Sequence, residues 1–249
     1  MLLPKKIMKE TFPSFKEAIR VDDASLLADD QIKTLAQSEL PMAMPSRGEL
    51  YEGSMTYLSS LGWDTSLLTP ETRVLAVEVG PGVTVVKLRA PDIIDALREN
   101  AITMGILGND VIVEELLNPN PTPLVRLRRL GFGGCSFRMG FRLNESIPSG
   151  NEIFERMKEA RIATSLPNTL TSILRGENIV LQKNQLRTLT GSVEAALALY
   201  PGVFFVADRV SSGESMRSNG IRADLALWES DGAYVVTTKK FAMKNNLLF

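Results

Sequence analysis

The sequence contains no histidine among its 249 residues. This absence excludes imidazole metal ligands, histidine-containing catalytic triads and imidazole acid–base catalysis. Cys135 is the only cysteine, so an intramolecular disulfide and a cysteine-rich metal site are excluded as well. Any functional site must therefore be built from other side chains, backbone groups or bound ions.

The sequence also lacks an excess of either charge and lacks long apolar runs. It has 28 basic and 29 acidic residues, for a formal net charge of −1. No overall basic field favours nucleic acid or an anionic membrane, so an anion site must be local. No apolar run approaches the length of a membrane span, and the N-terminus lacks the hydrophobic region of a signal peptide. We expect a cytoplasmic protein with neither nucleic acid nor membrane as a partner.

The stretch 202–220 carries the clearest local pattern. Val203 to Ala207 is apolar and has the length and composition of a buried strand, and Asp208 is expected at its end. A loop of small residues, 211–213, comes next. Residues 214–218 then predict a short helix, which the pair Asn219-Gly220 closes.

A strand, a small-residue loop and a helix start together form an anion site. Free backbone N–H groups and the positive end of the helix dipole point at one place, and Gly213 permits close approach to the backbone. Ser211, Ser212 and Ser215 can add hydroxyl donors, and Asp208 can accept from sugar hydroxyls. An ordinary capped helix after a core strand explains the same residues, because serine and glycine are common at helix starts. The spacing alone does not decide between the two.

The remaining pattern predicts two α/β domains with an N-terminal helical extension. Residues 1–37 predict two short helices that pack on the body or on a neighbour. Strands alternate with helices in a first domain, 38–131, and in a second domain, 132–219. The Asp231-Gly232 pair predicts a hairpin in the segment 220–249, which we expect to complete the first domain. A ligand cleft should lie between the domains, at the carboxyl ends of strands.

The sequence predicts individual elements at these positions. Strands are expected at 39–44, 74–79, 83–88, 102–108, 124–132, 136–143, 161–166, 179–182, 203–207, 221–228 and 233–239. The second and third of these should form a hairpin around Gly80-Pro81-Gly82. Helices are expected after Gly48 and over 89–97, 109–117, 167–174, 193–199 and 214–218.

Seven short motifs occur in one order along the chain. They are Ala43-Met-Pro-Ser-Arg-Gly-Glu-Leu50, Leu88-Arg-Ala-Pro-Asp-Ile93, Met104-Gly-Ile-Leu-Gly-Asn-Asp110, Leu130-Gly-Phe-Gly-Gly-Cys135, Arg161-Ile-Ala-Thr-Ser-Leu-Pro-Asn168, Thr190-Gly-Ser-Val-Glu194, and Asp208-Arg-Val-Ser-Ser-Gly-Glu-Ser-Met216 followed by Asn219-Gly220. Over residues 38 to 240 the chain resembles the catalytic part of ATP phosphoribosyltransferase, the enzyme of the first step of histidine biosynthesis. No single motif would establish the resemblance, but the ordered set is specific.

The resemblance implies a fold and a site. The fold would be two α/β domains around a cleft, like type II periplasmic binding proteins, with phosphoribosyl pyrophosphate (PRPP) between them. The last motif resembles the family's loop for the ribose 5′-phosphate. On that match the substrate-binding residues are Asp208, Ser211, Ser212, Gly213, Glu214, Ser215 and Glu194, with Asp208 and Glu194 at the ribose. The Met104–Asp110 motif adds Gly108 and Asp110.

The implied reaction suits a chain without histidine. N1 of the ATP adenine attacks the phosphoribosyl group with a free lone pair, so no strong base is needed. The departing pyrophosphate needs electrostatic help, which Mg²⁺ and arginines can supply. Arg89 and Arg73 match arginines of the family, and Arg47 follows the first strand, so these three are the catalytic candidates. Each could instead be a solvated surface arginine, and the metal ligands are unknown.

Departures from the family pattern leave alternatives open. Arg209 stands where the family has leucine, and Ser46 where it has lysine. An enzyme with another acceptor, or a non-catalytic module that binds small anions, therefore also fits the motifs. The length resembles that of the short form, which works as a dimer with a regulatory subunit similar to histidyl-tRNA synthetase. We expect ATP, PRPP, a second copy and that subunit as partners.

Overall fold

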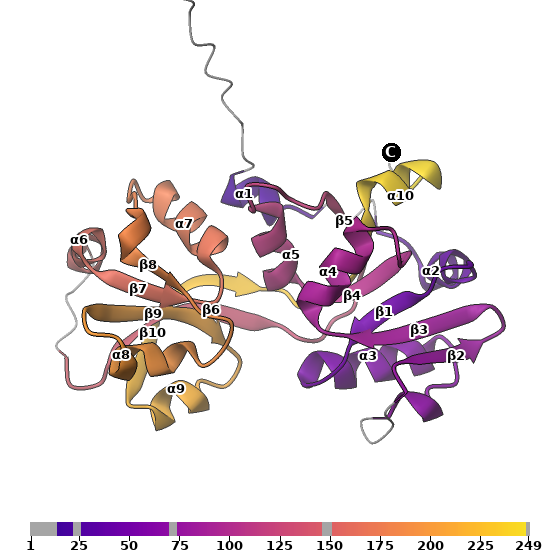
Figure 1. The fold of residues 1–249 in the computed structure, drawn as a ribbon, viewed down its shortest axis with the longest axis horizontal. Helices are drawn as coiled ribbons and strands as arrows, with labels where there is room; N and C mark the ends of the chain where they lie inside the picture. Colours follow the sequence, from indigo (N-terminus) through magenta and orange to yellow (C-terminus); the bar gives the residue numbers. More distant parts are fainter. Residues whose placement is uncertain (1–13, 22–25, 70–73, 146–150, 248–249) are drawn as a thin grey trace, which may run out of the picture.

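Two β-sheets, each covered by helices, lie side by side in the computed structural model (Figure 1). It describes residues 14–21, 26–69, 74–145 and 151–247. The first sheet has six strands in the order β2-β3-β1-β4-β11-β5, and the second has five in the order β10-β6-β9-β7-β8. Two α/β domains were predicted, and this architecture confirms them.

The first sheet is mixed rather than fully parallel. Its strands are β1 (Met42–Pro45), β2 (Ala76–Gly80), β3 (Val83–Leu88), β4 (Met104–Gly108), β5 (Leu124–Arg129) and β11 (Ala233–Thr238). β1 runs parallel to β3 and β4, whereas β11 is antiparallel to both of its neighbours. β2 and β3 pair antiparallel, which confirms the predicted hairpin.

Helices cover both faces of the first sheet. Successive residues of a strand point to opposite faces, and both faces of β1 carry buried side chains. Met42 and Met44 of β1 pack with the helix α3 (Glu49–Ser60) and with α2 (Asp29–Ala36). Ala43, between them, packs with α4 (Ala90–Arg98) and α5 (Asn109–Leu116). Pro91 lies in the first turn of α4, and its apolar residues are buried, as predicted.

The second sheet follows the same rule. Its strands are β6 (Cys135–Arg142), β7 (Arg161–Thr164), β8 (Leu186–Thr188), β9 (Val203–Val210) and β10 (Ile221–Ser230). Its helices are α6 (Asn151–Glu159), α7 (Pro167–Gly176), α8 (Ala196–Leu199) and α9 (Glu214–Ser218). Phe205 of β9 packs on the side of α6 and α7, and Val206 on the side of α8 and α9.

The predicted hairpin of the tail is wrong. β10 pairs with β6 in the second sheet, while β11 pairs with β4 and β5 in the first. Asp231 and Gly232 therefore form a crossing between the two sheets, and β10 does not complete the first domain as expected. At this crossing the N–H of Asn109 donates to the Gly232 carbonyl at 2.8 Å, and its side-chain amide donates to Asp231 at 2.8 Å. These contacts hold the Asp-Gly pair away from a two-residue hairpin turn.

A second prediction fails at residues 179–182, which form no strand. The Ile179 side chain is buried in the core of the second domain, and its N–H donates to the Leu174 carbonyl at 2.8 Å, which closes the end of α7. β7 lies between β9 and β8, and β8 begins at Leu186, after the predicted strand. Helix α6 was not predicted at all.

The N-terminal extension forms two short helices on the body, as predicted. In α2, Ile32 and Ala36 are buried in the core of the first domain, and the N–H of Leu27 donates to the Leu127 carbonyl at 2.6 Å. Helix α1 (Phe15–Ala18) lies beside α5 and α7 (Figure 1). Within the described part of the chain, none of the helices has the length and apolarity needed to cross a bilayer.

The crossing at Gly232 generates a stability prediction. Gly232 has φ of +118°, and a Cβ there would lie 2.5 Å from the Phe132 carbonyl oxygen. Gly232→Ala should therefore lower the free energy of unfolding by about 2 kcal/mol or more in urea denaturation. Gly176→Ala is the matched control, because a Cβ there meets nothing within 4 Å, and its effect should stay within about 1 kcal/mol. Equal effects of the two substitutions would contradict the crossing.

Candidate functional site

Asp208 lies inside strand β9 rather than at its end, where it was predicted. β9 continues to Val210, and Asp208 is in register with Arg138 of β6. The hydroxyl of Ser165, which follows β7, donates to Asp208 Oδ1 at 2.5 Å. Burial raises the pKa of Asp208, and this hydrogen bond offsets part of the rise. The neighbouring strands thus hold a carboxylate near the carboxyl end of β9, the central strand of the second sheet.

The loop after β9 has the geometry predicted from its small residues. Gly213 adopts φ of +74° and is the residue just before α9. The N–H of Glu214 donates to the hydroxyl of Ser212 at 3.3 Å, and Arg217 donates to the Ser212 carbonyl at 3.1 Å. Ser211 and Ser212 are exposed. Their hydroxyls can therefore reach a ligand.

The structure brings Glu194 to the same place. It belongs to a short 3-10 turn ahead of α8, and its Oε1 accepts a hydrogen bond from the hydroxyl of Ser215 at 2.5 Å. The two motifs that resembled the sugar-phosphate site are thus in direct contact. No local pattern in the sequence could have shown this contact, which joins residues 21 positions apart.

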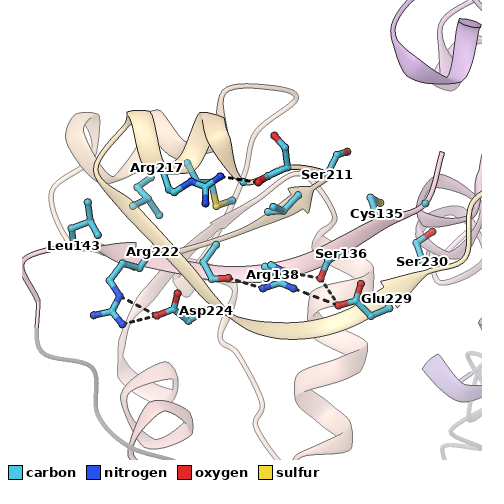
Figure 2. A pocket seen from close by; sticks show the side chains of 17 residues that line it. Cys135, Ser136, Arg138, Leu143, Ser211, Arg217, Arg222, Asp224, Glu229 and Ser230 are labelled. Carbon is cyan, nitrogen blue, oxygen red and sulfur yellow. Dashed lines mark hydrogen bonds and ion pairs between the residues drawn. The ribbon is translucent and has the colours of Figure 1, made fainter.

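A cavity of about 710 Å³ lies next to this loop, between α9 and the strands β6 and β10 (Figure 2). Ser211, Ser212 and Gly213 form part of its wall. The wall also contains three arginines that were not predicted as site residues, namely Arg138, Arg217 and Arg222. Arg138 and Arg222 have acidic partners in the same wall, Glu229 at 3.8 Å and Asp224 at 2.6 Å, so the cavity carries charges of both signs beside the serine loop.

Arg138 is the member of this group that sequence reasoning could have found. It lies two residues after Ser136 in β6, so both side chains point to the same face of the sheet. Its Nε donates to Ser136 Oγ at 2.9 Å and its Nη1 to the Ala223 carbonyl at 3.2 Å, and Nη2 lies 3.8 Å from Glu229 (Figure 2). An arginine within an apolar, alternating strand is the signal that could have identified it.

Gly108 and Asp110, from the first domain, lie at the junction with the second. Gly108 ends β4, and the Asp110 carboxylate folds back over it, so that a Cβ on Gly108 would lie 2.3 Å from Asp110 Oδ1. Asp110 Oδ2 accepts from Arg209 Nη1 at 2.9 Å. The neighbour of Asp208 in β9 thus contacts a predicted substrate-binding residue of the other domain.

Cys135 lies near the same junction. Burial and the charge of Asp110 raise the pKa of its thiol to about 12, while Arg209 acts in the opposite sense. The thiol is therefore neutral at physiological pH and a poor nucleophile. Catalysis through a cysteine thiolate is not supported by this environment.

The predicted arginines lie apart from the cavity of Figure 2. Arg47 and Arg89 are exposed and follow the adjacent parallel strands β1 and β3, whose ends are joined by a bond of 2.9 Å from the Ser46 N–H to the Leu88 carbonyl. Gly108, at the end of β4, belongs to the same carboxyl edge of the first sheet. Arg73 lies outside the described residues. The structure thus brings two cationic candidates to one edge but not to the cavity.

The described residues contain no group of three or more His, Cys, Asp or Glu side chains that could hold a metal ion. Mg²⁺ does not require such a group, because it often uses one or two carboxylates together with substrate phosphates and water. Among the predicted site residues, Glu194 contacts Ser215 beside the serine loop, and Asp208 lies in the strand that leads into it. They suit a metal that arrives with its substrate rather than a resident ion.

A family model described as HisG: ATP phosphoribosyltransferase matches residues 89–248, which is more than half of the chain. The chain belongs to the ATP phosphoribosyltransferase family. The match includes the serine loop, Glu194, Gly108 and Asp110 and begins at Arg89, whereas Arg47 and Arg73 lie before it.

Solved structures agree with this family in fold. The chain is similar to one from the ATP phosphoribosyl transferase (HisG:HisZ) complex of Thermotoga maritima, with a TM-score of 0.61, 21% identity, and coverage of 83% of this chain and 91% of that one. A Candida albicans protein described as having the generic periplasmic binding protein fold matches with a TM-score of 0.50, 12% identity, and coverage of 84% and 67%. The predicted type II binding-protein fold of the phosphoribosyltransferase family is confirmed.

Asp208 generates a prediction on stability and pH. Its raised pKa means that the folded state binds its proton more tightly than the unfolded state does, so folding stability falls as pH rises through the folded pKa. Asp208→Asn removes this titration. In urea unfolding, the variant should therefore gain stability relative to the parent as the pH rises above the ordinary aspartate pKa of about 3.9. If the parent instead became more stable relative to the variant as the pH rises, the assignment of Asp208 as a buried carboxylate would be contradicted.

Proposed function

We propose that this protein is an ATP phosphoribosyltransferase that transfers the phosphoribosyl group of PRPP to N1 of ATP and releases pyrophosphate. The observation that carries the proposal is the loop after β9. It combines the left-handed Gly213, exposed serine hydroxyls and the contact between Ser215 and Glu194, and it lies within the family match. This would be the first step of histidine biosynthesis.

The serine loop would hold the ribose 5′-phosphate. A phosphate can accept hydrogen bonds from the hydroxyls of Ser211, Ser212 and Ser215 and from backbone N–H groups around Gly213 and Glu214. Asp208 and Glu194 would accept hydrogen bonds from the ribose hydroxyls, because both carboxylates border the loop. The phosphate would thus fix one end of the sugar and the carboxylates the other.

The reacting centre would lie toward the first domain. N1 of adenine is a neutral nucleophile with a free lone pair, so the site needs no general base. Arg89 and Arg47, on the carboxyl edge of the first sheet, would interact with the pyrophosphate as its negative charge develops. Gly108 and Asp110 lie on the same edge and would border the substrate there.

Mg²⁺ bound to the pyrophosphate would neutralise part of the charge on the leaving group. Asp208 and Glu194 would be the candidate contacts for this ion, because Glu194 accepts from Ser215 beside the loop and Asp208 lies in the strand that leads into it. The arginines would supply the remaining positive charge.

Assembly forms part of the proposal. The similar Thermotoga chain is titled as part of a HisG:HisZ complex. We infer that this chain likewise works with a HisZ-type regulatory subunit, which resembles histidyl-tRNA synthetase, and we propose in addition that two copies of this chain form a dimer. It would then be the short form of the enzyme, working in the cytoplasm.

A turnover assay tests this function directly. The purified chain, with and without a HisZ-type partner, is given PRPP, Mg²⁺ and one purine nucleotide at a time, and pyrophosphate release is measured. With ATP as the nucleotide, we expect weak pyrophosphate release from the chain without its partner and a marked rise in release when the partner is added. Release with another nucleotide would establish a different acceptor. Binding of PRPP without release under any condition would establish a module that binds anions without catalysis.

Two substitutions separate catalysis from binding. Arg89→Ala should lower kcat about 100-fold or more, because one preorganised electrostatic contact to the leaving group is lost. Gly213→Val should instead weaken PRPP binding, because valine at φ of +74° is strained and its side chain would block the phosphate's approach to the backbone. Steady-state kinetics in both substrates distinguish these effects, with circular dichroism as the control for folding. A saturated Arg89→Ala enzyme at the parent rate would remove Arg89 from the mechanism.

A further inference from the structure

Helix α5 belongs to the first domain but carries two carboxylates that bind the second. Asp110 and Glu114 are four residues apart, so they lie on the same face of the helix, one turn from each other. Asp110 was expected to contact substrate, and Glu114 had no predicted role. Both side chains contact parts of the second domain that lie far away in sequence.

The first contact joins Asp110 to Arg209 of β9. Asp110 Oδ2 and Arg209 Nη1 are 2.9 Å apart, and the Asp110 side chain is only 5% exposed. A buried carboxylate that lost this partner would leave an uncompensated charge, which is far more costly than the loss of a surface pair.

The second contact joins Glu114 to the start of α7. Its Oε1 accepts the N–H of Asn168 at 2.9 Å, and its Oε2 accepts the N–H of Thr169 at 2.8 Å. The first N–H groups of a helix have no partner within the helix. Glu114 thus caps a helix of the other domain with both oxygens. Burial raises the pKa of this carboxyl.

Helix α1 of the N-terminal extension covers this junction. Ala18 packs against Val113 and Leu117 of the α5 segment, on the first domain. The ring of Phe15 meets the ring of Trp228, from β10 of the second domain, edge to face at 5.6 Å between centroids. Arg126 of β5 donates to the Ala18 carbonyl at 2.9 Å. Figure 1 shows α1 next to both α5 and α7.

We propose that Asp110, Glu114 and helix α1 form an interdomain brace that fixes the angle between the two domains. The brace would keep the carboxyl edge of the first sheet, with Arg47 and Arg89, at a constant spacing from the serine loop of the second domain. Asp110, Glu114 and Arg209 would then act as positioning residues in this respect. The N-terminal extension would be an internal strap across the domain junction. This inference goes beyond the proposed function and holds for any acceptor.

Double electron–electron resonance tests the brace without any assay of activity. Spin labels are placed at Glu99→Cys, just after α4, and at Arg175→Cys on α7, both exposed positions, in a Cys135→Ala background. Glu114→Gln is compared with Glu115→Gln. Glu115 is the next residue on the same helix and is buried, whereas Glu114 is half-buried, and Glu115 accepts from Thr122 and Arg98, both within the first domain.

The brace predicts one narrow distance distribution in the parent and in Glu115→Gln. Glu114→Gln should broaden it or add a longer distance, because an amide NH₂ would face an N–H of α7. Arg209→Leu and Phe15→Ala should do the same, whereas Arg222→Leu, which removes an ion pair within β10, should not. Parent-like distributions in folded Glu114→Gln, Arg209→Leu and Phe15→Ala would overturn the proposal.

Steady-state kinetics provide a second test, because a residue that only stabilises the fold would not change kcat and KM to different extents. Glu114→Gln leaves the serine loop intact, and this loop would hold the 5′-phosphate of PRPP, so the KM for PRPP should rise less than kcat falls. kcat should fall about tenfold or more, the scale of one lost hydrogen bond to a charged group, because the arginines shift relative to the substrate. If the parent chain itself shows no turnover with or without the partner, the proposed function fails. The distance measurement would still test the brace, because it does not depend on activity.

Discussion

The contacts of helix α5 are the constraint on which the arrangement of this molecule depends. Gly108 lets the chain turn from β4 into the helix under the folded-back carboxylate of Asp110. Asn109, next in the chain, binds Arg126 of β5 and Asp231 at the crossing between the sheets. Glu114, one turn after Asp110, holds the start of α7. One short segment therefore connects the site, the crossing and the second domain.

The local part of the site could be predicted from the sequence because its determinants are local. A left-handed glycine, small hydroxyl residues and a helix start follow one another from Ser211 to Ser218, and each has a preference that can be recognised within a few residues. The strand β1 and the position of Pro91 in the first turn of α4 were predictable for the same reason. The two-domain fold followed from the order of such elements.

The parts that failed depend on partners distant in sequence. The Asp231-Gly232 pair is a strong hairpin signal, yet Asn109 and the backbone of Phe132 determine its conformation. The apolar side chain of Ile179 packs in the core where the chain leaves α7, and it does not belong to a strand. Arg138, Arg209 and Glu114 were not assigned a role in advance, since the carboxylate or N–H groups they contact come from other elements. Strand order and side-chain pairing across sheets are not encoded in any short window.

The family relationship also has a physical consequence for motion. Binding proteins of this fold have two domains around a cleft, and such domains can in general close around a ligand by hinge motion. Here the junction carries a buried ion pair, a helix capped from the other domain, and an N-terminal helix packed across it. These contacts favour a preorganised site, in which less ordering accompanies substrate binding.

Small-angle X-ray scattering of the parent chain, with and without saturating PRPP, tests this account most directly. It compares the domain arrangement before and after binding at constant molecular mass. A fixed interdomain angle predicts the same radius of gyration and superimposable scattering curves in the two states. A clear decrease in the radius of gyration on binding, as two domains close on the ligand, would contradict it.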